Sequence, residues 1–273
     1  MLANPRARKA AVLFVIILAE IIVLGVMFAR YCGKRAQQAA EEAQNIQSGR
    51  TYVESLESRD LSSIQQQVME LERARQEAAW REMKEELVNG DADVWSFLSS
   101  SVIMGDSRAV GFYLYGFLPE HQVFAGAGNT IRKIEEDIDN VAEINPSELF
   151  LCYGINDHSI GFWSSGEEYA AEYLEILNTL RQALPDTDIY VVSTLPANAT
   201  GIATESSWAT IPEWNDVLEE MCAENGYGFV DCSELMEEHA DLYDIDGIHV
   251  QYSLYPYWAA EMVMAMYESE QQA

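Results

Sequence analysis

Residues 101–108 read Ser-Val-Ile-Met-Gly-Asp-Ser-Arg (SVIMGDSR), a short apolar run that ends in a glycine and polar residues. An apolar run of this length, bounded by turn residues, predicts a buried β-strand that turns into a helix. Ser107 then lies at the junction, where its hydroxyl is exposed and its backbone N–H points out of the helix start. The stretch therefore predicts the first strand of a sheet and a polar group at the end of that strand.

The alternation of strand and helix continues to the end of the chain. Further apolar runs predict strands at residues 122–125, 148–153, 188–194 and 228–231. Helical spacing predicts helices at about residues 108–117, 130–143, 166–184, 212–225 and 254–268. Such an alternation predicts a five-stranded parallel sheet covered on both faces, in which ligands bind beyond the carboxyl ends of the strands.

Three further motifs fall at those strand ends or in the last loop. The second strand runs into Ala-Gly-Ala-Gly-Asn-Thr (125–130) and the third into Gly-Ile-Asn-Asp (154–157), while Asp-Gly-Ile-His (246–249) precedes the last helix. A serine hydroxyl becomes an effective nucleophile when a histidine takes its proton and a carboxylate orients the imidazole. Each motif alone is short, but four of them in this order at one sheet edge are hard to obtain by chance.

With these motifs the chain resembles the GDSL/SGNH hydrolase superfamily, whose fold is a three-layer, flavodoxin-like α/β/α sandwich. The resemblance implies that Ser107 is the nucleophile, His249 the base and Asp246 the residue that orients the base. It also implies an oxyanion hole made by the N–H groups of Ser107 and Gly128 and by the side-chain amide of Asn156. Neither a metal nor an organic cofactor is expected.

The resemblance covers about residues 98–268, and Arg108 departs from its usual pattern. Arg108 stands where the GDSL string has leucine, which places a cation beside the nucleophile. We therefore expect Arg108 to be a candidate contact for an anionic acyl group or substrate. Asp157 is expected to support its loop, and Cys222 and Cys232 could form a disulfide in an exported protein or remain a free pair.

The N-terminal part of the chain predicts a membrane anchor. Residues 10–29 read AAVLFVIILAEIIVLGVMFA, with Glu20 as the single charge, and basic residues flank the run on both sides. At about 1.5 Å per residue such a run covers the ~30 Å hydrocarbon core, and no small-residue cleavage site directly follows it. We expect a cytoplasmic tail (1–9), a single transmembrane helix and an extracellular catalytic domain, although the charges leave the orientation open. Glu20 could mediate a helix–helix contact or be a tolerated acid, and Cys32 could be acylated or have no role.

Residues 30–94 predict a helical stalk, because they are rich in good helix formers and nearly free of glycine and proline. Leu61, Ile64, Val68 and Leu71 follow a coiled-coil spacing that fades after about two heptads, so the stalk is a candidate for homodimerisation. Asn-Gly-Asp at 89–91 predicts the end of the helix, and the hydrolase-like domain is expected at 95–273.

The charge of the chain limits its function. Its formal net charge of -29, from 45 acidic and 16 basic residues, excludes a nucleic-acid binder, which needs a basic face. We expect a membrane-anchored serine esterase that removes small acyl groups, such as acetyl, from cell-surface glycans or related esters. The alternatives are an O-acyltransferase that acts on envelope polysaccharide with the same triad, and a non-catalytic surface adaptor.

Overall fold

The computed structural model describes residues 27, 30, 33–35, 37–53 and 62–272. The chain divides into two compact units, Met1–Arg73 and Ala74–Ala273. In the first unit, residues 37–53 are helical. The predicted transmembrane segment 10–29 lies outside the described residues, apart from Met27, and among the described residues no helix is both long and apolar enough to cross a bilayer.

A five-stranded parallel sheet forms the centre of the second unit, as predicted. Its strand order is β2-β1-β3-β4-β5. The strands are β1 (Val102–Gly105), β2 (Val123–Ala125), β3 (Glu148–Cys152), β4 (Asp188–Val192) and β5 (Gly228–Val230). Gly105 pairs with Ala125 on one side and with Cys152 on the other, so the carboxyl ends of three strands meet at one edge.

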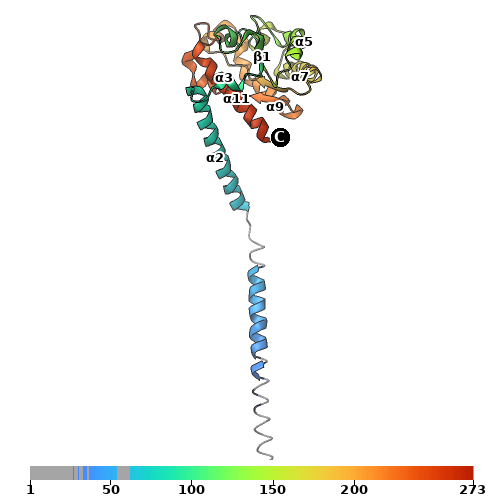
Figure 1. Ribbon diagram of the computed structural model, residues 1–273, viewed down its shortest axis with the longest axis vertical. Helices are drawn as coiled ribbons and strands as arrows, with labels where there is room; N and C mark the ends of the chain where they lie inside the picture. Colours follow the sequence, from blue (N-terminus) through green and yellow to red (C-terminus); the bar gives the residue numbers. More distant parts are fainter. Residues whose placement is uncertain (1–26, 28–29, 31–32, 36, 54–61, 273) are drawn as a thin grey trace, which may run out of the picture. The chain divides into compact units, whose positions relative to one another are not determined.

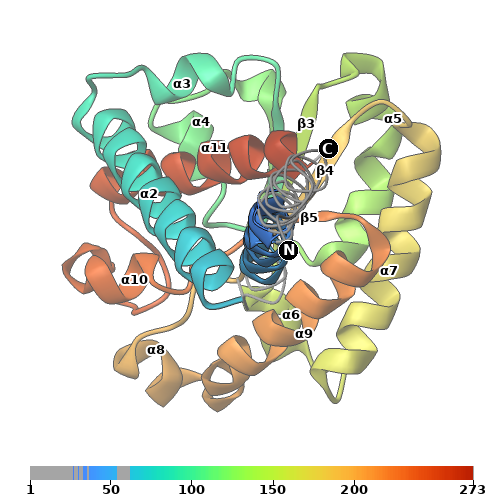
Figure 2. The ribbon, with the colours of Figure 1, turned by 90° about the horizontal axis from the view of Figure 1, so that it is seen from below.

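Helices cover both faces of the sheet and complete the predicted three layers (Figure 2). Val102 and Met104 of β1 belong to one core and Ile103 to the other, because successive side chains of a strand point to opposite faces. The first core lies under α5 (Ile134–Ile144), α7 (Gly166–Ala183) and α9 (Ile211–Asn225). The second lies under α4 (Gly111–Leu114), α3 (Val94–Phe97) and α11 (Tyr255–Gln272), and α3 packs against α11 (Figure 1).

The last turns of α2 (Ser62–Asn89) belong to this second unit. Leu87 is only 2% exposed, and Trp80, Met83 and Val88 pack against the same core. The second compact unit thus begins at Ala74 and includes these turns. The predicted helix end is confirmed, since α2 stops at Asn89 and Gly90 has a positive φ of 78°.

Two details of the secondary structure differ from the sequence prediction. The helix predicted at 108–117 is reduced to α4, and the short helices α6 (Ile155–Ile160), α8 (Ala199–Thr204) and α10 (Leu235–Glu238) were not predicted. Cys222 and Cys232 are free and lie in different cores, so the sheet separates them and no disulfide joins them.

Candidate active site

The nucleophile turn follows β1 directly. The N–H of Asp106 donates to the carbonyl of Cys152 at 3.1 Å, which ties the turn to β3, and the N–H of Ala109 donates to the carbonyl of Asp106 at 3.2 Å. These bonds replace the helix that the sequence predicts from residue 108. Ser107 is consequently held on a tight turn at the carboxyl edge of the sheet, half-buried.

Ser107, His249 and Asp246 form a continuous hydrogen-bonded relay. Ser107 Oγ lies 3.0 Å from His249 Nε2, and His249 Nδ1 lies 2.6 Å from Asp246 Oδ2. Asp246 Oδ1 also accepts the backbone N–H groups of Ile248 (3.0 Å) and His249 (2.9 Å). Partial burial opposes ionisation of Asp246, but these hydrogen bonds outweigh it and lower its pKa. Asp246 is therefore a carboxylate that can orient the imidazole with Nδ1 protonated and Nε2 free to accept the serine proton.

The loop that carries His249 is closed by its own backbone. The N–H of Asp244 donates to the carbonyl of His249 at 2.8 Å, and Tyr243 forms an antiparallel bridge with Val250. The side chains of His249 and Asp246 are 38% and 45% exposed, so the relay lies at an open surface. Water and an ester can both reach it.

Asn156 lies at the start of α6 and braces the loop after β2. Its Nδ2 donates to the carbonyl of Asn129 at 2.8 Å, and Asn129 Nδ2 donates to the carbonyl of Gly105 at 3.2 Å. The second N–H of the Asn156 amide is not used in this chain of bonds. The ends of β1, β2 and β3 are thereby joined at the edge that Ser107 occupies.

Gly128 occupies a left-handed turn in the same loop, with φ 78°, and is exposed. Only glycine adopts this conformation without strain. Within the described residues, no hydrogen bond uses the N–H of Ser107 or of Gly128. Both donors, with the spare N–H of Asn156, are thus free to bind an oxyanion.

Asp157 supports the same loop from the buried side, as expected. It is 1% exposed, and its Oδ1 accepts the backbone N–H of Ile131 at 3.0 Å. Gly154, two residues before Asn156, has φ 134°, and a Cβ there would overlap the side chain of Thr194. The geometry of this motif therefore depends on a glycine at its start and an anchored carboxyl at its end.

Burial changes the protonation of two groups under the loop after β2 (residues 126–130), which we call the oxyanion loop. Burial raises the pKa of Asp157 to about 7, although hydrogen bonds from backbone N–H groups partly offset the effect. Burial lowers the pKa of His158 to about 3, and its ring lies 4.0 Å from that of Trp214. His158 is therefore a neutral core residue at physiological pH and no rival to His249 as the base.

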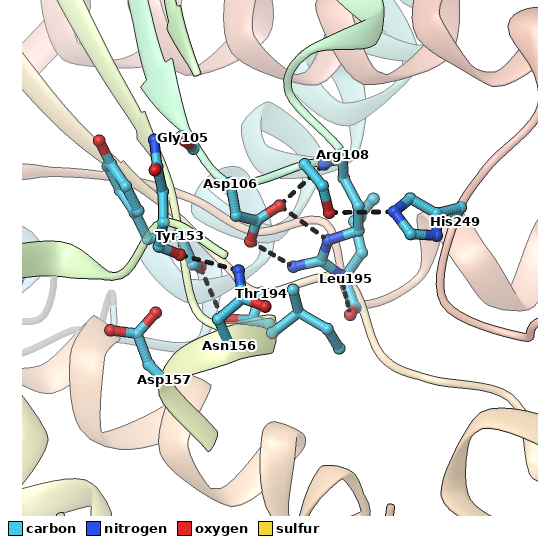
Figure 3. Close-up of polar contacts among 12 residues, drawn as sticks. Gly105, Asp106, Arg108, Tyr153, Asn156, Asp157, Thr194, Leu195 and His249 are labelled. Carbon is cyan, nitrogen blue, oxygen red and sulfur yellow. Dashed lines mark hydrogen bonds and ion pairs between the residues drawn. The ribbon is translucent and has the colours of Figure 1, made fainter. Parts of the chain in front are cut away.

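Arg108 does not face the active-site surface, which corrects the expectation of a substrate contact. It is 3% exposed, and its guanidinium bonds to both carboxylate oxygens of Asp106 (3.3 and 3.2 Å) and to the carbonyl of Leu195 (2.7 Å). Figure 3 shows the carboxylate of Asp106 turned towards the guanidinium of Arg108. The two charges on either side of Ser107 neutralise each other and fix the turn.

Asp106, Asn129 and Tyr255 are the site residues that sequence analysis missed. Tyr255 Oη donates to the carbonyl of Arg108 at 2.7 Å, so all three hold the nucleophile turn or the oxyanion loop. Opposite charges two residues apart, in a domain poor in cations, were a signal for the pairing of Asp106 with Arg108. In the part of the chain that the structure describes, no group of three or more His, Cys, Asp or Glu residues could hold a metal ion.

Comparisons with known proteins give one family match and several similar structures. The model of the GDSL-like lipase/acylhydrolase family matches residues 105–253. A GDSL-like lipase from Bacteroides thetaiotaomicron is 16% identical with a TM-score of 0.50, covering 63% of this chain and 88% of its own. An acetylxylan esterase from Geobacillus stearothermophilus is 18% identical with a TM-score of 0.47, covering 60% of this chain and 92% of its own. No curated protein matches the chain.

Proposed function

Because this chain belongs to the GDSL-like lipase/acylhydrolase family and is an ester hydrolase, we propose that it cleaves its substrate through an acyl-enzyme on Ser107. The observation that carries the proposal is the relay from Ser107 Oγ through His249 to Asp246, with separations of 3.0 and 2.6 Å. A hydrolase of this kind supersedes the non-catalytic adaptor considered above.

The reaction proceeds in two steps, acylation of Ser107 and hydrolysis of the acyl-serine. Ser107 Oγ attacks the ester carbonyl carbon while His249 Nε2 takes the serine proton and then gives it to the departing alkoxide, as the ester C–O bond breaks. Water then attacks the acyl-serine, His249 accepts a water proton, and that proton returns to Ser107 as the acid leaves. The N–H groups of Ser107 and Gly128 and the amide of Asn156 bind the oxyanion in both steps.

The substrate is an uncharged ester of a small acyl group, such as acetyl, carried by a glycan. Residues 101–273 contain only four Lys and Arg residues. Each is engaged elsewhere: Arg108 with Asp106, Arg132 with Glu172, Lys133 with Glu136, and Arg181 over the ring of Tyr227. Because each of these four cations already has a partner, an anionic acyl group or a phosphorylated acceptor would have to compete for it.

The experiment that tests the mechanism compares the full-length protein with Ser107→Ala. The wild type is expected to hydrolyse p-nitrophenyl acetate and to react with a fluorophosphonate serine probe, and Ser107→Ala is expected to lose both properties. Hydrolysis or labelling that persists in Ser107→Ala would place the nucleophile elsewhere. A folded wild type that does neither would contradict the proposed function as a whole.

The enzyme is held at the cell membrane by residues 10–29, with residues 1–9 in the cytoplasm and the catalytic domain (95–273 in the sequence prediction) outside. The support is the apolar run itself, with one charge between two basic clusters. The stalk can also dimerise, since Val68 and Leu71 of its heptads are 48% and 72% exposed. Protease treatment of intact cells should remove the domain; a domain that resists until the cells are lysed would argue for the opposite orientation.

A further inference from the structure

A stack of three aromatic rings lies next to the loop that carries His249. The ring of Trp95, from α3, stacks on Phe117 at 4.5 Å and 21°, and Phe117 stacks on Tyr252 at 4.7 Å and 27°. Phe117 follows α4, which lies beside α3 (Figure 2). Tyr252 is 55% exposed, so the stack starts at a partly buried ring and ends at the surface.

Within the described part of the chain, the rings that Tyr252 contacts are those of Phe117 and Tyr115. Tyr115 lies 5.4 Å from Tyr252 and 6.4 Å from Phe117, and these distances place it to the side of the stack rather than on its end. Its ring is turned 83° from that of Tyr252, and Tyr115 is 41% exposed. The two tyrosines therefore form an exposed corner with one wall along each ring, which we call the aromatic corner.

The aromatic corner is fixed relative to the catalytic groups. Tyr252 follows His249 by three residues, a span of at most about 10 Å. The segment between them is held by the bridge of Val250 to Tyr243 and by the N–H of Gln251, which donates to the carbonyl of Leu242 at 2.8 Å.

A second connection runs to the nucleophile turn. The ring of Tyr115 packs against Tyr255 at 5.3 Å, and Tyr255 Oη donates to the carbonyl of Arg108, the residue after Ser107. Tyr255 is 3% exposed, so this link is inside the protein. The corner is thus tied to both sides of the Ser107–His249 pair.

The chemistry of the corner matches a sugar ring. A tyrosine combines an apolar face, suited to the C–H face of a pyranose, with a hydroxyl that can bond to ring hydroxyls. The four lysine and arginine residues of 101–273 each already contact an acidic side chain or, for Arg181, an aromatic ring, so an anionic ligand would have to compete for them. A long acyl chain would be better served by a groove closed on several sides than by an exposed corner rimmed with hydroxyls.

We propose that Tyr115 and Tyr252 form a subsite for a neutral sugar ring of the glycan whose ester is cleaved at Ser107. This inference rests on the proposed function and extends it, since it assigns the carbohydrate part of the substrate to named side chains. Aromatic contacts of this kind predict a preference for an ester on an oligosaccharide over the same ester on a small alcohol.

The test measures kcat/KM of the full-length protein on mono-O-acetylated cellotriose and on p-nitrophenyl acetate, in one detergent. Tyr252→Ala should lower the ratio of kcat/KM on the trisaccharide to kcat/KM on p-nitrophenyl acetate by roughly 3- to 10-fold, mainly because KM for the trisaccharide rises. Tyr252→Phe keeps the ring and should remain near the wild-type ratio. Phe97→Ala, which removes an exposed ring that packs against Tyr267 instead, should keep the wild-type ratio.

Three results for Tyr252→Ala would overturn the subsite. They are an unchanged ratio, an equal loss of kcat/KM on both esters, and a loss on p-nitrophenyl octanoate without a loss on the trisaccharide. The last result would assign the corner to the acyl chain. A wild type that cleaves p-nitrophenyl acetate through Ser107 but leaves the trisaccharide intact would also refute it, with the esterase still standing. Absence of Ser107-dependent hydrolysis of both esters would overturn the proposed function, and the subsite with it.

Discussion

The two sides of Ser107 differ in exposure although both consist of charged and polar side chains. On one side, His249 and Asp246 are 38% and 45% exposed; on the other, Arg108 and Asp106 are 3% and 0% exposed. The exposed pair can exchange protons with substrate and water. The buried pair cannot reach substrate and instead fixes the turn on which Ser107 is carried. Two similar pairs of side chains next to one nucleophile thus have different roles: His249 and Asp246 take part in the chemistry, and Arg108 and Asp106 position the turn.

The largest expected effect is on the exposed side. His249→Ala should lower kcat on p-nitrophenyl acetate by about 10⁴-fold, because among the described residues His249 is the group that bonds to Ser107 Oγ and can take its proton. The change should leave the unfolding midpoint near the wild-type value, since the ring is exposed. His121→Ala, at an exposed histidine outside the site, serves as the control and should keep full activity. A kcat above a tenth of the wild-type value in His249→Ala would mean that another group is the base.

On the buried side, Arg108→Met should act first on stability. Removing the guanidinium leaves the carboxylate of Asp106 buried without its partner, and breaking such a pair costs about 3–5 kcal/mol. Urea unfolding should show the loss, and Asp106→Asn added to Arg108→Met should recover part of it. Arg132→Met, which removes the exposed partner of Glu172, should cost far less. Equal stability of the two single variants would erase the distinction between the sides.

The exposed side was easier to predict from sequence than the buried one. Ser107, Asn156, Asp246 and His249 stand at strand ends or in the closing loop of a strongly alternating chain, and that order alone brings them to one edge. Arg108 was misjudged because a sequence shows neither the carbonyl of Leu195 nor the burial that joins Arg108 to Asp106. Long-range packing, which a sequence does not show, also decides that the second compact unit begins at Ala74. Leu87 in α2 lies in the stretch that the sequence predicts as a stalk, but its side chain is buried in the core of the second unit.

The oxyanion loop connects the two sides of Ser107. Asn156→Ala separates the contribution of Asn156 to catalysis from its contribution to stability. Losing one oxyanion donor typically lowers kcat by about 10²–10³-fold. Here the change also removes the bond to the carbonyl of Asn129, so the unfolding midpoint should fall slightly as well. Asn225→Ala, at the end of α9, removes an amide that bonds only to its own helix and should keep full activity. A loss of stability with kcat unchanged would show that Asn156 is structural, like Asp106.

The smallest effect concerns Asp157, which holds the oxyanion loop from below. Its pKa is raised to about 7 by burial, above the ordinary value of 3.8, so between about pH 4 and 7 the folded protein keeps a proton that the unfolded chain has lost. The stability that this carboxyl contributes is therefore complete at low pH and declines as the pH rises towards 7. Asp157→Asn keeps a neutral side chain that can still accept the N–H of Ile131, so it should lack this decline.

The measurement is the difference in unfolding free energy between wild type and Asp157→Asn, by urea denaturation at several pH values. Between pH 5 and 6 the wild type should lose up to about 1.4 kcal/mol relative to the variant. His158, whose lowered pKa gives the opposite trend, and the surface carboxylates titrate in both proteins, so their contributions cancel in the difference. Parallel stability curves would mean that Asp157 is already ionised in the folded protein. Asp157 would then carry a charge directly beneath the oxyanion loop, and a buried group would influence the chemistry as well as the stability.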